Sequence, residues 1–142
     1  MTDGTFEKVQ KSDNPMYGPR KLLLCGFPAK AQTTFNKVLD MAGLTGVAHV
    51  WANGDHVHLH LSELLAMPNG VGDGTDSSLP RAIIVSGITE NQLHTLMTIC
   101  RKSGMQQALW AALTPTSETW PLEDLLNELQ AERKALAKRK KQ

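Results

Sequence analysis

Residues 81–128, RAIIVSGITENQLHTLMTICRKSGMQQALWAALTPTSETWPLEDLLNE, determine the fold predicted for this chain. Residues 82–86 (AIIVS) form a short apolar run that ends at Gly87, which is typical of a strand buried on both faces. A second apolar run, at 108–113 (ALWAAL), predicts another strand. The residues between the two runs are numerous enough to form a crossover helix.

Two helices complete this unit. Thr89 and Gln92 have the spacing of a capping box, and the apolar side chains that follow recur at helical spacing until Gly104. Pro121 suits the start of the last helix. Its buried stripe is predicted to be Leu122, Leu125, Leu126 and Leu129. The stretch therefore predicts the order strand, helix, strand, loop, helix.

The first half of the chain has the same order of features. At an offset of 61 residues, Gly26 corresponds to Gly87 and Gly43 to Gly104. Each glycine follows a predicted element, and a glycine with positive φ is the usual residue at such an end. The elements predicted in this half are a strand, a helix, a strand and a short helix, over residues 21–25, 28–42, 47–52 and 61–65.

We therefore predict an α/β fold in which two tandem βαβα halves form one four-stranded sheet packed with helices. A duplicated unit would give the fold pseudo-two-fold symmetry, with the two leading strands paired at the centre. The alternative is that two unrelated βαβα units look alike. The chain is predicted to form one α/β domain over residues 20–130, made of halves 20–67 and 81–128 that a mobile linker, 68–80, connects. A flexible N-terminal segment (1–19) precedes the domain, and a basic C-terminal helix extension (131–142) follows it.

Composition narrows the class of protein. A chain of 142 residues with 41% hydrophobic and 20% charged residues is expected to form one soluble globular domain. No apolar run approaches the roughly 18 residues of a membrane span, so we expect no membrane partner. The N-terminal residues lack the apolar core of a secretory signal. Two cysteines do not suggest a disulfide framework, so we expect a cytoplasmic protein.

The second half resembles a prokaryotic family of small uncharacterised proteins, the domain of unknown function 3783. The resemblance lies in IIVSGIT (83–89), then LTPTSETW (113–120), then the leucine-rich LEDLLNEL (122–129). Ser117 stands where the family usually has Asn, and LLLCGF in the first half is similar to the family's opening strand. The resemblance implies this fold, but it implies no established activity, substrate or catalytic residue.

The loop between the last strand and the last helix is the first candidate ligand site. Backbone N–H groups at a helix N-terminus can hold an anion, and ligands of open α/β sheets favour the carboxyl ends of strands. The alternative is structural, with hydroxyls that close turns and a tryptophan that packs on the core. The candidate residues of this loop are Thr114, Pro115, Thr116, Ser117 and Trp120.

Cys25 is the remaining candidate for this site. It ends the first predicted strand just before Gly26 and a helix, and a helix N-terminus lowers the pKa of a thiol. Ser86 occupies the corresponding position in the second half. The simpler interpretation is that Cys25 is a small buried apolar residue.

Three histidines suggest a metal site as an alternative. If His56, His58 and His60 lie on an extended segment, they share one face, and imidazoles are ligands for zinc, nickel or copper. His49 or Asp55 could supply a fourth ligand. Three solvated histidines on a loop are the competing interpretation.

The basic C-terminus is a candidate for binding nucleic acid. Residues 131–142 hold six of the 15 Lys and Arg residues but only one of the 14 Asp and Glu residues. Such a patch could make weak, salt-dependent contacts with nucleic acid, although no aromatic side chain lies nearby to stack on bases. A solvated helix end is the competing interpretation. The six cations are Arg133, Lys134, Lys138, Arg139, Lys140 and Lys141.

No motif specifies a reaction. The sequence contains no phosphate-binding glycine loop and no recognisable nucleophile–base arrangement, so we expect no cofactor. The favoured function is a non-catalytic binding or regulatory module with an unknown protein partner, or one that self-associates through the sheet edge or the last helix. The alternatives are a ligand binder or enzyme that uses the Thr114–Trp120 loop, and a metal-binding protein that uses the three histidines.

Overall fold

The computed structural model describes residues 13–105 and 107–141. Its elements are β1 (Lys21–Cys25), α2 (Ala29–Met41), β2 (Ala48–Ala52) and α3 (Leu61–Leu65), then β3 (Ala82–Ser86), α4 (Glu90–Lys102), β4 (Leu109–Ala112) and α5 (Leu122–Lys141). Single 3-10 turns, η1 (Gly54–His56) and η2 (Ser117–Thr119), precede α3 and α5. The predicted strand–helix–strand–helix order is confirmed in both halves.

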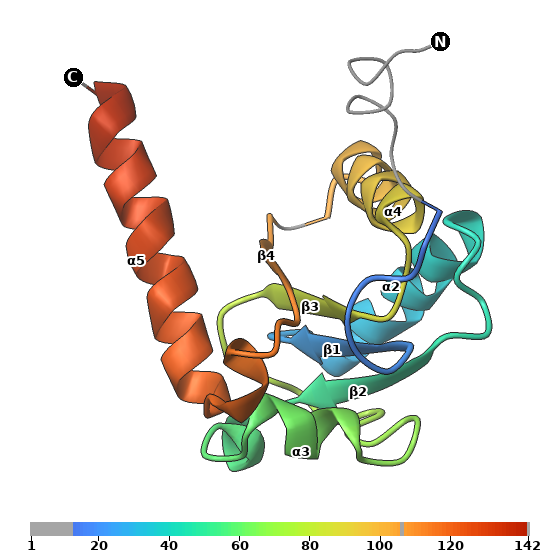
Figure 1. Cartoon of the computed structure of the whole chain (residues 1–142). Helices are drawn as coiled ribbons and strands as arrows, with labels where there is room; N and C mark the ends of the chain where they lie inside the picture. The colour runs from blue at the N-terminus through green and yellow to red at the C-terminus, as the bar shows by residue number, and fades with distance from the viewer. Residues whose placement is uncertain (1–12, 106, 142) are drawn as a thin grey trace, which may run out of the picture.

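The strands form one four-stranded sheet in the order β2-β1-β3-β4 (Figure 1). β1 is parallel to β2 and β3 is parallel to β4, whereas β1 and β3 are antiparallel. The predicted pairing of the two leading strands at the centre is thus confirmed. Leu23 lies opposite Ile84, and an isolated bridge joins His60 to Pro121. Both pairs are separated by the 61 positions that relate the two halves.

Helices cover both faces of the sheet. One face presents Leu22, Leu24 and Ile83 to a core that includes α2 and α4. The other presents Leu23 and Ile84 to α3 and the first turns of α5, because successive side chains of a strand point to opposite faces. β1 and β3 are buried at every position, which explains why both are uniformly apolar in sequence.

Both strand-ending glycines are required by the tertiary structure. Gly26 and Gly87 have φ values of +78° and +70°, which favour glycine. A Cβ atom on Gly26 would lie 2.5 Å from the carbonyl oxygen of Leu79, and one on Gly87 would lie 2.6 Å from the backbone nitrogen of Arg20. Each turn therefore packs directly against the chain that enters the neighbouring central strand.

The segment before β1 contacts the second half of the chain. The Met16 N–H donates to the Ile88 carbonyl at 2.8 Å, and the Tyr17 hydroxyl donates to Glu118 at 2.7 Å. Residues 1–12 of the predicted flexible segment lie outside the described residues.

The linker predicted to be mobile lies along the outer edge of β2. The Gly70 N–H donates to the His49 carbonyl at 2.8 Å, and the Trp51 N–H donates to the Val71 carbonyl at 2.8 Å. The His49 N–H donates to the Asn69 side chain at 2.9 Å. This edge of the sheet is therefore covered by the protein's own chain.

α5 runs back along β4 and then projects beyond the body (Figure 1). The Arg133 guanidinium donates to the Ala108 carbonyl, just before β4, at 2.8 Å. The predicted basic extension is continuous with this helix, which reaches Lys141. Among the residues that the structure describes, no helix combines the length and apolarity needed to cross a membrane.

Candidate functional site

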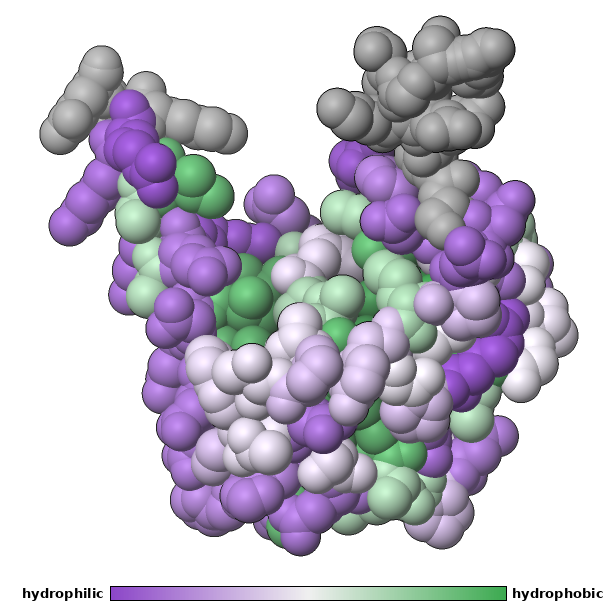
Figure 2. Space-filling model, viewed as in Figure 1, coloured by the Kyte–Doolittle hydropathy of each residue, from purple (hydrophilic) through white to green (hydrophobic). Residues whose placement is uncertain are grey.

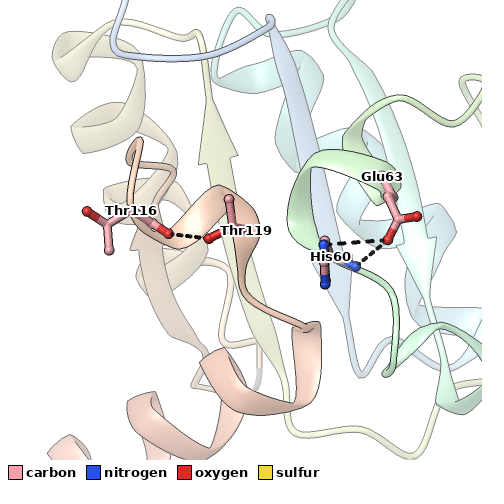
Figure 3. Close-up of polar contacts among 4 residues, drawn as sticks. All are labelled: His60, Glu63, Thr116 and Thr119. Carbon is pink, nitrogen blue, oxygen red and sulfur yellow. Dashed lines mark hydrogen bonds and ion pairs between the residues drawn. The ribbon is translucent and has the colours of Figure 1, made fainter.

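The structure brings the histidine segment and the Thr114–Trp120 loop together. The Leu61 N–H donates to the Trp120 carbonyl at 3.0 Å, and the Leu122 N–H donates to the Leu59 carbonyl at 2.9 Å. Figure 3 shows the two loops through His60 and Glu63 on one side and Thr116 and Thr119 on the other. We call this region the loop junction, defined as residues 56–63 and 114–123.

The hydroxyl groups of Thr114, Ser117 and Thr119 bond within the Thr114–Trp120 loop. The Thr114 N–H donates to the Ser117 Oγ at 3.1 Å, and the Ser117 N–H donates to the Thr114 Oγ1 at 2.9 Å. The Thr119 Oγ1 donates to the Thr116 carbonyl at 3.1 Å (Figure 3). Trp120 is partly buried and packs against the core beneath α3 and α5. These contacts close a turn before α5.

The start of α5 has no free N–H group for an anion among its first four residues. Leu122 and Glu123 donate their N–H groups to the carbonyls of Leu59 and Val57, each at 2.9 Å. The N–H groups of the next two residues, Asp124 and Leu125, both donate to the Pro121 carbonyl. The anion site expected at this helix N-terminus is therefore already filled by backbone carbonyls of the first half.

The histidine segment is not the extended strand that the alternation predicted. His56 ends the 3-10 turn η1, where its Nδ1 accepts the Asn53 N–H at 3.0 Å. The His58 Nδ1 lies 2.7 Å from Glu123 Oε2. The His60 N–H donates to the Glu63 carboxylate at 2.8 Å (Figure 3). The turn arises because Asn53 caps it with its side chain.

Each histidine thus has its own partner. Within residues 13–105 and 107–141, the structure contains no group of three His, Cys, Asp or Glu side chains arranged to hold a metal ion. His49 belongs to β2 and stacks edge-on against Trp51, and the Asp55 N–H caps η1 by donating to Asn53. The His58–Glu123 pair and the backbone bonds between Leu59, Leu61, Trp120 and Leu122 hold the two segments of the loop junction together.

Cys25 lies beside Ala52 at the end of β2, at the opposite end of the sheet from the strand end that leads into the Thr114–Trp120 loop. It pairs with Ala82 at the start of β3, whereas Ala112, at the end of β4, pairs with Val85. Burial raises the pKa of the Cys25 thiol to about 12, so the expectation of a thiolate activated by the following helix fails. The side chain is fully buried in the core beneath α3.

Sequence reasoning missed a cleft along the outer edge of β4. A cavity of about 390 Å³ lies between α4 and β4, lined by Met97, Cys100, Met105, Ala108 and Trp110 among others. On the other face of the strand, between β4 and α5, a second cavity of about 210 Å³ includes Leu109 and Arg133 in its lining. We call these two cavities and the β4 edge between them the β4 cleft.

Figure 2 shows this region from outside. Apolar surface lies in the hollow between the projecting α5 and the body of the molecule. Leu136 adds to it on α5, with 53% of its surface exposed. It continues the stripe of Leu122, Leu125 and Leu129 at helical spacing.

The outer edge of β4 also carries unpaired backbone groups. Leu109 and Leu113 donate inward, to the carbonyls of Arg81 and Val85. Because backbone groups alternate sides along a strand, those of Trp110 and Ala112 point outward. In the described part of the chain, no hydrogen bond to these outward groups is present. The edge of β2 is covered and the edge of β4 is open.

A partial signal for this cleft exists in the sequence. Leu136 lies seven residues after Leu129, beyond the last turn that the body covers, so its place on the stripe could have marked an uncovered apolar position. The identity of the edge strands could not be read in the same way, because strand order depends on pairing between distant segments.

One comparison with known proteins identifies part of the chain. The family model described as Domain of unknown function (DUF3783) matches residues 81–136. Neither a curated protein nor a solved structure matches the chain. The matched segment begins at the entry to β3 and includes α4, β4, the Thr114–Trp120 loop and most of α5. The match therefore covers the second half of the chain and does not extend over β1, α2, β2 or α3.

Proposed function

We propose that this protein is a non-catalytic binding module that takes up a polypeptide strand at the β4 cleft. The observation that carries the proposal is the difference between the two sheet edges. The linker covers the edge of β2, whereas the edge of β4 keeps the backbone groups of Trp110 and Ala112 unpaired. An open edge strand readily accepts another strand through main-chain hydrogen bonds.

The surroundings of β4 support this mode of binding. The cavity of about 390 Å³ on the α4 side gives a bound side chain an apolar pocket beside Trp110. The cavity on the α5 side places Arg133 and Lys134 near the same edge. Strand addition uses such pockets for alternate side chains of the ligand, while the backbone bonds supply affinity.

The loop junction does not compete as an active site. Its histidines, the hydroxyls of Thr114, Ser117 and Thr119, and the N–H groups at the start of α5 have partners within the protein, as in the Thr114–Ser117 and His58–Glu123 pairs. A general base or nucleophile needs a group that is free to reach a substrate. The buried Cys25, with its pKa raised to about 12 by burial, is also poorly suited to act as a nucleophile.

The test is selection of random peptides displayed on phage against immobilised protein. Ala112→Pro removes an outward N–H without touching the bonds to β3, and an edge strand tolerates proline there. Ala112→Ser keeps the N–H and is the matched control. We expect selected peptides to bind the wild type and Ala112→Ser, and to bind Ala112→Pro about 10-fold more weakly or worse. Peptides that bind all three proteins equally would refute the proposal.

A further inference from the structure

We propose that the strand taken up at the β4 cleft is a segment of a partner protein in which apolar and acidic side chains alternate. The apolar side chains enter the cavity between α4 and β4, and the acidic ones enter the cavity between β4 and α5. This inference rests on the proposed function and names the chemistry of its ligand. Successive side chains of a strand point to opposite faces of a sheet, and each face of β4 has its own cavity.

The cavity between α4 and β4 is suited to apolar side chains. Trp110 points to this face of the sheet, since it packs against the core that includes α2 and α4. Met97 and Met105 line the cavity of about 390 Å³ together with Trp110, and methionine side chains adapt to ligands of different shape. Residues directly opposite each other on paired strands point to the same face. We therefore expect the ligand residue opposite Trp110 to be large and apolar.

The cavity between β4 and α5 is basic. Leu109 contributes to it from β4, and Gln130, Arg133 and Lys134 contribute to it from α5. The spacing of these three helix residues places them on one side of α5, and all three are exposed. The bond from the Arg133 guanidinium to the Ala108 carbonyl, at 2.8 Å, holds that cation beside the edge of the sheet. A carboxylate on the ligand residue next to the apolar one is complementary to this pair of cations.

The cations of the cleft have no acidic partners within the protein. Among the described residues, no Asp or Glu lines either cavity, and neither Arg133 nor Lys134 forms an ion pair. Asp124 and Glu128 of α5 line a separate cavity with Trp120, so these acidic residues lie on another side of the helix. The whole chain has a net charge of only +1. The positive charge at the cleft is therefore local, and it favours an acidic ligand.

A polypeptide fits the cleft better than a nucleic acid does. The unpaired backbone groups of Trp110 and Ala112 match those of another strand. A nucleic acid would contact the cations through its phosphates, but it has no backbone amides to continue the sheet. An extended polypeptide meets the open edge, the apolar cavity and the cations at the same time.

Three phage libraries test the acidic positions. Each displays a segment of about seven residues, a common strand length, in which random apolar residues occupy alternate positions. The positions between them carry Glu in the first library, Gln in the second and Lys in the third. We expect the wild type to enrich the Glu library about 10-fold over the Gln library, and further over the Lys library, because each carboxylate gains about threefold from an exposed cation. Ala112→Pro should abolish this enrichment, and equal enrichment of the three libraries by the wild type would overturn the inference.

Two charge reversals test which side of β4 receives the acidic residues. Lys134→Glu changes the cavity on the α5 side. Arg101→Glu is the matched control, because Arg101 is also exposed but lines the cavity on the α4 side. We expect Lys134→Glu to enrich the Glu and Lys libraries to within about threefold of each other, whereas Arg101→Glu should keep the preference for Glu. Far-UV circular dichroism checks that both variants are folded, and equal losses of preference would refute the assignment of sides.

The outcomes separate this inference from the proposed function. If random peptides distinguish Ala112→Pro from Ala112→Ser but the three libraries are enriched equally, the cleft binds strands and only the acidic ligand is refuted. Binding of single-stranded oligothymidylate is measured beside the libraries. If no library or random peptide is enriched, and the oligonucleotide binds the wild type more tightly than Lys134→Glu, the cations serve nucleic acid and both proposals fail.

Discussion

Replacing Gly26 by alanine tests why this residue follows β1. Gly26 has φ +78°, and an added Cβ would lie 2.5 Å from the Leu79 carbonyl oxygen and 2.7 Å from the Arg81 nitrogen. Gly43 provides a matched control because it also has φ +78° but has nothing within 4 Å of an added Cβ. Comparison of the two alanine variants therefore isolates the cost of close packing from the cost of backbone conformation.

The magnitudes follow from these two geometries. A left-handed conformation costs an L-residue about 1–2 kcal/mol relative to glycine, and the more restricted unfolded chain offsets about 0.4–1 kcal/mol of this in both variants. Relief of the overlap at Gly26 adds about 1–3 kcal/mol, because the obstructing atoms are backbone. The Arg81 side chain donates to the Gly26 carbonyl at 2.9 Å and restricts movement. We therefore expect Gly26→Ala to be less stable than Gly43→Ala by about 1–3 kcal/mol.

Equilibrium unfolding in urea, followed by far-UV circular dichroism, measures this difference. Gly87→Ala and Gly104→Ala repeat the comparison in the second half, since Gly87 meets the backbone of Pro19 and Arg20 while Gly104 faces open space. Equal free energies of unfolding for Gly26→Ala and Gly43→Ala would refute the argument that close packing selects glycine after the strand.

Three further predictions concern the thiols and the helix end. In the native protein, Cys25 and Cys100 should resist thiol reagents at pH 8, because burial raises their pKa values to about 12 and about 11. Both thiols should react once the protein is unfolded in urea. Fast labelling of Cys25 in the native protein would contradict this prediction. The free energy of unfolding should fall as pH rises above about 9, by up to about 1.4 kcal/mol per pH unit for each thiol, because the unfolded thiols release protons that the folded ones retain. Cys25→Ala should reduce this dependence of the free energy of unfolding on pH. If urea titrations at pH 8 to 10 gave the same dependence for Cys25→Ala and the wild type, the raised pKa of Cys25 would not be its cause. Finally, we expect weak retention of the protein on immobilised DNA, which added salt should abolish. The double variant Lys138→Glu and Arg139→Glu should abolish it as well. Retention that does not depend on salt would show that the basic end of α5 does not cause the binding.

Several features of the fold could be predicted from local sequence because local physics determines them. The uniform apolar runs KLLLC and AIIVS required cover on both faces, and both are central strands. Thr89 and Gln92 form the predicted capping box. Gly26 and Gly87 end their strands where positive φ is needed. In each case the residues that carry the signal are near one another in the chain.

The structure supports the structural alternative for each candidate site, because the side chains and the helix end in question are bonded or buried within the protein. His56 is drawn into a 3-10 turn by Asn53, so the alternation of three histidines did not produce one face. The N–H groups at the start of α5 are taken by Val57 and Leu59, which are more than 60 residues away in sequence. Cys25 is covered on its face of the sheet by α3 and α5.

The sequence by itself therefore determined which segments become strands and helices, where they end, and that two similar halves share one sheet. Only the tertiary structure decided that the linker covers the edge of β2 while the edge of β4 stays open. That difference depends on hydrogen bonds between segments far apart in the chain, such as Trp51 with Val71. Periodicity and capping reflect interactions within a few residues, whereas an open edge depends on which distant segments pair.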